Sequence, residues 1–121
     1  MECRAVRGAT TVANNTAREI EEATTEVLQK IIRENKIRIK DIVSAYFSVT
    51  VDLNAQFPAA AARKMGWTYV PMLCTYELDV PSSLRQCIRV LLTYNTRKAQ
   101  HKIKHQYLRG ATLLRPDLVE Q

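Results

Sequence analysis

Apolar residues recur along this chain with two different periods, and the periods predict its helices and strands. After residue 16 the apolar positions lie three or four apart, which is typical of a helix with one buried face. These positions are Ile20, Ala23, Val27, Leu28, Ile31 and Ile32. Thr16 and Glu19 have the spacing of a capping box, in which each side chain binds a free backbone N–H of the first turn. We therefore expect a long helix that begins after Thr16 and ends near Asn35.

A period of two predicts the strands. Residues 43–50 alternate between apolar and polar, which indicates a strand with one buried face. Its expected buried residues are Val43, Ala45, Phe47 and Val49. Further strands are predicted at 69–77 and 87–95. A short first strand is predicted at 3–7, broken at Gly8.

Proline and glycine mark the remaining boundaries. Pro58 can begin a short second helix and Gly66 can end it in the left-handed conformation. Residues 80–83 have the composition of a turn between two strands. In the tail, a short strand or helix is expected near 103–109, followed by an extended piece at 111–115.

The order of these elements predicts an α/β (α+β) fold with a single mixed sheet and helices packed against it. The length of 121 residues suits one domain over residues 1–121. One long and one short helix cannot cover both faces of such a sheet. We therefore expect self-association to bury the rest.

The composition of the chain indicates a globular protein and bears on its location and its partners. The chain is 46% hydrophobic and 25% charged, as globular proteins are. No apolar run approaches the roughly 20 residues of a membrane helix, and the first residues lack the apolar core of a signal peptide. We therefore expect no membrane partner and a cytoplasmic location. The net charge of +6 favours an anionic partner, either nucleic acid or a small carboxylate or phosphate.

Few residues are candidates for metal or covalent chemistry. The three cysteines, Cys3, Cys74 and Cys87, lack metal-type spacing and are expected to be reduced thiols. His101 and His105 lie four apart, but nothing near them completes a ligand set, so no metal is expected. No nucleophilic triad is apparent, and three glycines are too few for a glycine-rich phosphate loop.

Arg89 is the most informative residue, because it interrupts the apolar run 87–92. Arginine does not lose its proton, and a buried charge needs a partner. The partner is either a protein carboxylate or an anionic substrate. Glu77, the one acid in the apolar run 72–77, is the candidate carboxylate.

The segment Arg4-Ala5-Val6-Arg7-Gly8-Ala9-Thr10-Thr11 closely resembles the amino-terminal motif of the AroH-class chorismate mutases. Other pieces match this family in the same order, over nearly the whole chain. They are Asp52-Leu53, Phe57-Pro58-Ala59, Arg63, Gly66-Trp67, Val70-Pro71, Cys74, Glu77, Cys87-Ile88-Arg89-Val90, Asn95-Thr96, His105, Tyr107-Leu108 and Leu114-Arg115-Pro116-Asp117-Leu118. Each piece alone is weak, but their ordered occurrence together is highly specific.

The resemblance implies an isomerase that converts chorismate to prephenate, a step towards phenylalanine and tyrosine. The reaction is an intramolecular [3,3] Claisen rearrangement with no cofactor and no covalent intermediate. The implied fold is a mixed five-stranded sheet with helices. Three subunits would form a homotrimer, a pseudo-α/β-barrel with active sites at the subunit clefts.

The resemblance also implies a role for individual residues. Arg89 would lie against the ether oxygen of the breaking bond, and Glu77 would bind the ring hydroxyl. Arg7 and Tyr107 would hold a carboxylate of the substrate. The pocket would be lined by Leu73, Cys74, Thr75 and Tyr76, and the cleft shaped by Phe57, Arg63, Leu114 and Arg115, some of them from a neighbouring subunit.

Elementary chemistry agrees with these implied roles. Chorismate is a dianion, which suits a basic chain. A unimolecular rearrangement needs no acid, base or nucleophile. It needs a compact conformer to be held and a fixed positive group where negative charge develops, and arginine keeps its charge in a dry site.

Three features depart from the family pattern. Ala60 stands where some relatives have a basic residue, and Arg97-Lys98-Ala99 replaces a stretch that often holds an acid and a proline. Cys74 and Glu77 have opposite parity, so a regular strand would point them to opposite faces. If both contact the substrate, the strand must bend or bulge between them.

Two other functions remain open at this point. The first is a small nucleic-acid-binding module that uses basic residues of the tail, although that segment has few aromatics for base stacking. Those residues are Arg97, Lys98, Lys102, Lys104 and Arg109. The second is an inactive ligand-binding trimer of the same fold.

Overall fold

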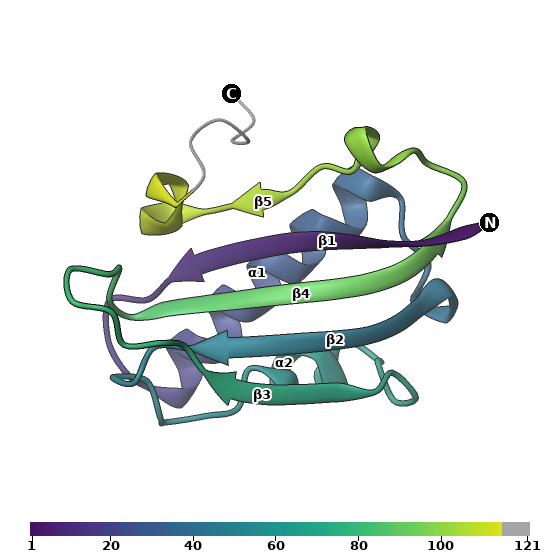
Figure 1. Ribbon diagram of the computed structural model, residues 1–121. Helices are drawn as coiled ribbons and strands as arrows, with labels where there is room; N and C mark the ends of the chain where they lie inside the picture. The colour runs from purple at the N-terminus through teal and green to yellow at the C-terminus, as the bar shows by residue number, and fades with distance from the viewer. Residues whose placement is uncertain (115–121) are drawn as a thin grey trace.

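Five strands form one mixed sheet in the order β3-β2-β4-β1-β5 in the computed structural model, which describes residues 1–114 (Figure 1). The strands are β1 (Glu2–Thr11), β2 (Ile42–Val49), β3 (Met72–Tyr76), β4 (Cys87–Thr96) and β5 (Gln106–Tyr107). Strand β4 is antiparallel to both β1 and β2, whereas β3 is parallel to β2 and β5 is parallel to β1. The predicted mixed sheet is confirmed.

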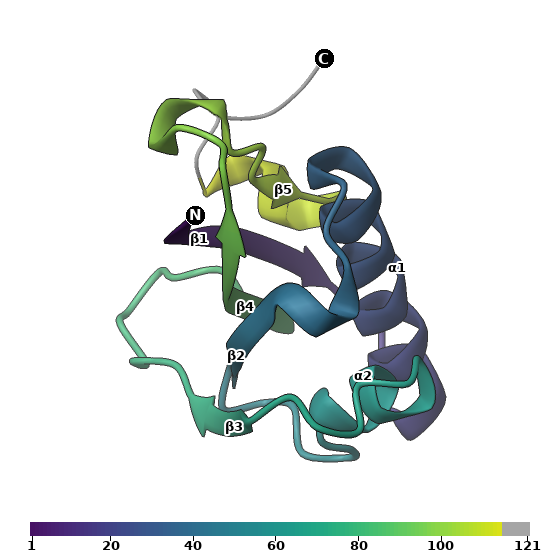
Figure 2. The ribbon, with the colours of Figure 1, turned by 90° about the vertical axis from the view of Figure 1, so that its right-hand side faces the viewer.

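Both α-helices pack on the same face of this sheet (Figure 2). They are α1 (Ala17–Asn35) and α2 (Ala59–Lys64), and the shorter 3₁₀ segments are η1 (Ile39–Asp41), η2 (Gln100–Lys102) and η3 (Arg109–Leu113). The main core lies between α1 and the sheet, where Leu28 and Ile31 pack with Phe47 and Leu92. No helix among the described residues is long and apolar enough to cross a membrane.

Helix α1 begins and ends where the sequence predicts. The Thr16 hydroxyl accepts a hydrogen bond from the Glu19 N–H at 3.1 Å, and the Glu19 carboxylate accepts one from the Asn14 N–H. The first bond satisfies a free donor of the first turn, and the second ties the segment before the helix to it. The helix ends at Asn35 because Lys36 adopts the left-handed conformation, with φ of 54°. The predicted apolar stripe is buried, except that Ile32 is half-buried.

The expected break of the first strand at Gly8 is wrong. Strand β1 continues through Gly8 to Thr11 and pairs with β4 along its whole length. A Cβ atom on Gly8 would lie 2.6 Å from the Ile31 Cδ1 atom and 3.1 Å from a methyl of Val90. Glycine is therefore the residue that lets α1 pack closely against the middle of β1.

Two other expectations need correction. Val43 is 43% exposed rather than buried, because the pairing of β2 with β4 shifts register between Ile42 and Ser44. This shift turns Val43 out of the alternation that buries Ala45. Of the extended piece predicted at 111–115, residues 111–113 belong instead to the 3₁₀ segment η3, closed by hydrogen bonds such as the Ala111 N–H to the Leu108 carbonyl, and residue 115 lies outside the described residues.

The other predicted boundaries hold with small shifts. Pro58 precedes α2, and Gly66 follows it with φ of 93°, so the short helix and its left-handed end are confirmed. The turn at 80–83 is closed by a hydrogen bond from the Ser83 N–H to the Val80 carbonyl. The predicted strand at 69–77 is shorter, since β3 spans only Met72–Tyr76.

Neither α1 nor α2 packs on the second face of the sheet (Figure 2), where among the described residues only the short η3 contacts the end near Tyr107. We call this second face the open face. Large apolar side chains on it are exposed, among them Tyr46 at 46%, Leu73 at 60% and Leu91 at 41%.

Candidate active site

A row of five residues crosses the open face from one edge of the sheet to the other. Direct cross-strand pairing gives the order Thr75, Ser48, Arg89, Ala9 and Tyr107. Residues paired in this way project from the same face of a sheet. The register therefore brings Arg89, Thr75 and Tyr107 to one face, although they are far apart in the sequence.

A second row lies beside the first. Leu73, Tyr46, Leu91 and Arg7 are paired in that order, two residues along each strand from the first row. Arg7 is exposed, and its backbone N–H donates to Nδ1 of His105 at 2.9 Å. Two arginines and an apolar floor thus share the open face.

Arg89 has a carboxylate partner within the chain. Its Nε atom lies 3.4 Å from Oε1 of Glu77, and the two side chains are 31% and 24% exposed. Glu77 directly follows β3, and its own N–H donates to the Val49 carbonyl at 2.8 Å. This ionic contact lies at Nε, and the guanidinium has further N–H donors on its two terminal nitrogens, which can serve Cys87 and an anionic ligand. Arg89 is therefore half-buried. Glu77 contacts one side of its guanidinium, and the exposed side can contact a ligand.

The Glu77 carboxylate has a second partner that the sequence did not single out. The Ser48 hydroxyl donates a hydrogen bond to Oε1, the same oxygen that faces Arg89. Ser48 lies on the polar side of the predicted strand at 43–50, which is the only signal that the sequence offers. Its pairing with Arg89 depends on the register of β2 against β4.

Tyr107 and Cys87 form the buried end of the site. Tyr107 packs with Ala9, Cys87 and Ala111, and its hydroxyl has no hydrogen-bond partner among the described residues. That buried hydroxyl lies in the same cross-strand row as Arg89, with Ala9 between them. Burial raises the pKa of the Cys87 thiol, and the neighbouring Arg89 charge and hydrogen bond offset this shift only in part. Cys87 is thus a neutral, packed thiol.

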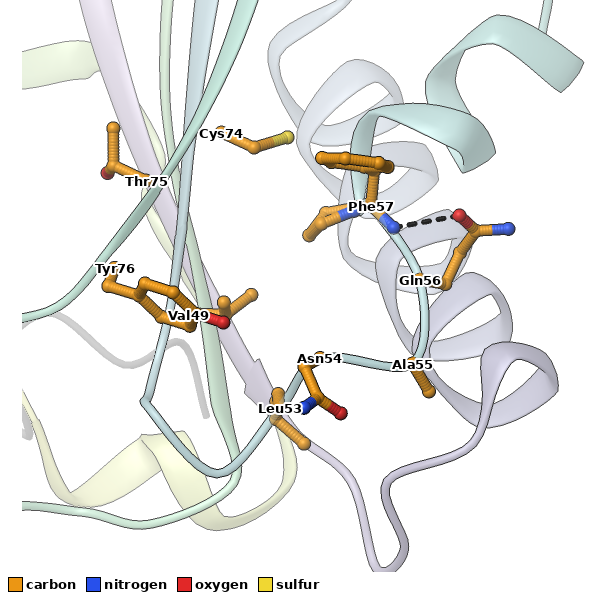
Figure 3. Close-up of a pocket in the computed structure, with 10 residues that line it drawn as sticks. Val49, Leu53, Asn54, Ala55, Gln56, Phe57, Cys74, Thr75 and Tyr76 are labelled. Atoms are coloured by element: carbon orange, nitrogen blue, oxygen red, sulfur yellow. Dashed lines mark hydrogen bonds between the residues drawn. The ribbon is translucent and has the colours of Figure 1, made fainter.

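A pocket of about 290 Å³ lies on the other side of β3. It is lined by residues 53–58 and by Val49, Cys74, Thr75 and Tyr76. Figure 3 shows the Cys74 side chain directed towards Phe57, whereas Thr75 is directed to the opposite side of the strand. Most of the predicted charged and polar groups lie outside this pocket, so we place the candidate site on the open face and regard the pocket as its neighbour.

Cys74 and Glu77 lie on opposite faces, as a regular strand requires, and the bend that a shared ligand would need within one chain is not seen. Strand β3 pairs with β2 in unbroken register from Met72 to Tyr76. Cys74 therefore packs against the core on the helix-covered side, and Glu77 reaches Arg89 by continuing the regular alternation. Within one chain the Cys74 thiol and the Glu77 carboxylate lie on opposite faces.

The structure brings together only part of the predicted set. Arg89, Glu77, Arg7, Tyr107, Leu73 and Thr75 share the open face or its rim. Leu114 packs on the Tyr107 cluster, and Arg115 lies outside the described residues. The remaining residues, Phe57, Arg63, Cys74 and Tyr76, lie on α2 or on its side of β3.

Comparison with known proteins gives one consistent result. Residues 3–118 match the family model of chorismate mutase type I. Chorismate mutase AroH of Bacillus subtilis (strain 168) is 47% identical, with 98% of this chain and 94% of that protein covered. Chorismate mutase AroH of Thermus thermophilus is 45% identical, with 95% of each covered. The solved structure of a chorismate mutase from Clostridium thermocellum, Cth-682, superposes with a TM-score of 0.89 at 50% identity, with 90% of this chain and 97% of that chain covered. The chain therefore belongs to the type I, or AroH-class, chorismate mutases.

Proposed function

We propose that this chorismate mutase converts chorismate to prephenate on the open face of its sheet, around Arg89 and Glu77. The observation that carries the proposal is the half-buried Arg89–Glu77 pair at 3.4 Å, on the same face of the sheet as Arg7 and as Tyr107, whose hydroxyl has no partner among the described residues. The product would serve the synthesis of phenylalanine and tyrosine, and we propose a cytoplasmic location.

The rearrangement breaks one C–O bond and forms one C–C bond within a single molecule. No proton is transferred, and no cofactor or covalent intermediate is needed. The protein has to hold the substrate in a compact chair-like conformer and to stabilise the negative charge that grows on the ether oxygen. Both tasks are met by fixed hydrogen-bond donors and charges.

Each residue of the open face then has a distinct role. The free donors of Arg89 meet the ether oxygen, where its charge counts most in the transition state. Glu77 accepts a hydrogen bond from the ring hydroxyl. Arg7 and the Tyr107 hydroxyl bind a carboxylate of the dianionic substrate.

We propose that the active enzyme is a homotrimer. The exposed apolar residues of the open face support an interface there, since such patches mark contact surfaces. Arg63 and Phe57 lie on the helix side of their own chain and are exposed. They can reach a substrate at Arg89 only from a neighbouring subunit. Residues from two chains, including Leu114 and Arg115 of the tail, would close the cleft.

The nucleic-acid alternative has less support. The basic segment 97–104 follows the end of β4 opposite to Arg89. It is therefore separate from the candidate site, and the family match covers both regions. An inactive trimer of the same fold is distinguished from an enzyme by a direct assay for prephenate.

The proposed role of Arg89 predicts how two variants behave. Arg89→citrulline keeps the shape but loses the charge, and Arg89→Lys keeps a charge but loses the planar fork. Both should lower kcat more than they raise KM. The citrulline variant should lose on the order of 100-fold or more in rate, comparable with removing an oxyanion-hole donor. The measurement is the rate of prephenate formation per folded active site.

A purely structural Arg89–Glu77 pair predicts a different outcome. In that case both variants would lose thermal stability and subunit assembly, and the folded fraction would turn over normally. A near-wild-type kcat for citrulline at position 89 would remove Arg89 from the mechanism. A wild-type protein that forms no prephenate would contradict the proposed function itself.

A further inference from the structure

We propose that Ser48 is a positioning residue that orients the Glu77 carboxylate for the reaction, an inference that rests on the proposed function. Two contacts carry it. The Ser48 hydroxyl donates to Oε1 of Glu77, and the same oxygen lies 3.4 Å from Nε of Arg89. Ser48 therefore acts on the pair at the point where the acid and the arginine meet.

The two residues differ in how firmly their backbones are held. Ser48 lies within β2, between β3 and β4, and is paired with both Thr75 and Arg89. Glu77 is the first residue beyond β3, at the start of a connection whose next residue, Leu78, is 83% exposed. The Glu77 backbone is held by its N–H bond to Val49, but its long side chain has freedom that a second anchor must remove.

The hydrogen bond from Ser48 also limits how Glu77 meets Arg89. A carboxylate and a guanidinium prefer to form two parallel hydrogen bonds. Such a pair would use the arginine donors that the ether oxygen needs. With Oε1 also bound to Ser48, Glu77 approaches Arg89 through Nε. Nε of Arg89 makes no hydrogen bond of good geometry among the described residues, so the two charges are adjacent without being locked together.

A serine suits this position because it supplies a donor without bulk. Its neighbours in the row are Thr75 and Arg89, and the substrate has to lie above them. A longer donor at position 48 would fill that space. A side chain without a hydroxyl would leave Glu77 free to turn onto Arg89.

The test uses three variants of Ser48. Ser48→Thr and Ser48→Val have side chains of the same shape as each other, and Ser48→Ala has a smaller one. Threonine keeps the donor, whereas valine has the same shape without it. We expect the alanine and valine variants to lose roughly 10- to 100-fold in kcat, the range for losing a hydrogen bond to a charged group, with a smaller change in KM. The threonine variant should recover most of that loss.

Ser44→Ala is the matched control. Ser44 lies on the same strand and face, and its hydroxyl is bonded across to Thr93 at 2.7 Å, but it is two rows away from Arg89. The folded variant should keep a nearly wild-type kcat, since the Ser44 hydroxyl bonds to Thr93 and to neither member of the Arg89–Glu77 pair. A loss equal to that of Ser48→Ala would mean that any cross-strand hydroxyl has this effect, and would overturn the inference.

A double-mutant cycle with Glu77→Ala tests whether Ser48 acts through Glu77. Once the carboxylate is absent, removal of the Ser48 hydroxyl should cost little further rate. An equal loss in both backgrounds, or an unchanged kcat in folded Ser48→Val, would contradict the positioning role. Both results presuppose an active wild type, so they are distinct from a failure of the proposed function.

Discussion

Glu77 illustrates at the scale of single residues how a carboxylate can serve a reaction without transferring a proton. Its carboxylate sits between the Ser48 hydroxyl and the Arg89 guanidinium, both of which are hydrogen-bond or ionic partners of its charged form. The proposed rearrangement has no proton to move, so Glu77 is required only to accept hydrogen bonds.

This role predicts that Glu77→Gln is less damaging than Glu77→Ala. The amide oxygen can still accept from Ser48 and from the ring hydroxyl, whereas alanine loses both contacts. The hydrogen bond to a charged group is worth roughly 1.5–3 kcal/mol, so the alanine variant should lose the larger part of the rate. The measurement is kcat for both variants after their folding has been verified. If the two changes abolish the reaction equally, proton transfer by Glu77 becomes the better explanation.

The sequence identifies candidate site residues best where a charged side chain interrupts an apolar run. Arg89 and Glu77 are charges in apolar runs, and their proximity was one of the alternatives that this conflict predicts. Ser48 is a polar residue on the polar side of a strand, so nothing in the local pattern distinguishes it. Its role depends on which residues of β3 and β4 lie beside it, which is a property of the sheet register.

At the scale of elements, the packing of α1 on β1 explains why Gly8 was misread as a break. A glycine weakens the interior of a strand, so the local sequence predicts an interruption there. In the structure the glycine is explained by tertiary packing, because methyl groups of Ile31 and Val27 crowd the position that a Cβ atom would take. Helix α1 itself was predicted well, since capping and a 3.6-residue period are local properties of the sequence.

This contact predicts that Gly8→Ala destabilises the fold. The added methyl would lie 2.6 Å from Cδ1 of Ile31 and 3.1 Å from methyls of Val27 and Val90, so the Ile31 side chain or the helix itself has to shift. Overpacking of this kind costs about 1–3 kcal/mol. The free energy of unfolding, measured by urea denaturation of wild type and variant, provides the test.

The double variant Gly8→Ala with Ile31→Val is the control for this explanation. Valine lacks the Cδ1 atom that causes the contact, and on its own should cost about 0.5–1.5 kcal/mol. If crowding is the cause, the double variant should be more stable than the sum of the two single changes. Strict additivity would instead indicate a general loss of strand or helix stability.

At the scale of the whole molecule, the distribution of the predicted site residues has a direct consequence. Arg89, Glu77 and Arg7 occupy the open face, whereas Phe57 and Arg63 lie on the helix side. A single chain cannot bring the two groups to one ligand. The family resemblance implies that both groups of residues line one cleft. The fold of one chain agrees with this only if a second chain supplies Phe57 and Arg63.

The same reasoning leads to the prediction of a homotrimer that depends on the open face. Sedimentation equilibrium at micromolar concentration should give about three times the mass of the chain, which is 13.8 kDa.

Leu91 is exposed in the middle of that face, beside Tyr46 and Arg7. Leu91→Lys places a charge in the proposed interface next to an existing arginine, and desolvation and repulsion should both weaken assembly. The variant should therefore sediment as a smaller species with an unchanged circular dichroism spectrum, and it should lose activity because each site needs its neighbour. Gln29→Glu, on the exposed side of α1, is the control and should remain fully assembled and active. A stable wild-type monomer with full activity would show that one chain is sufficient, and the contributions of Phe57 and Arg63 from a neighbouring subunit would then be excluded.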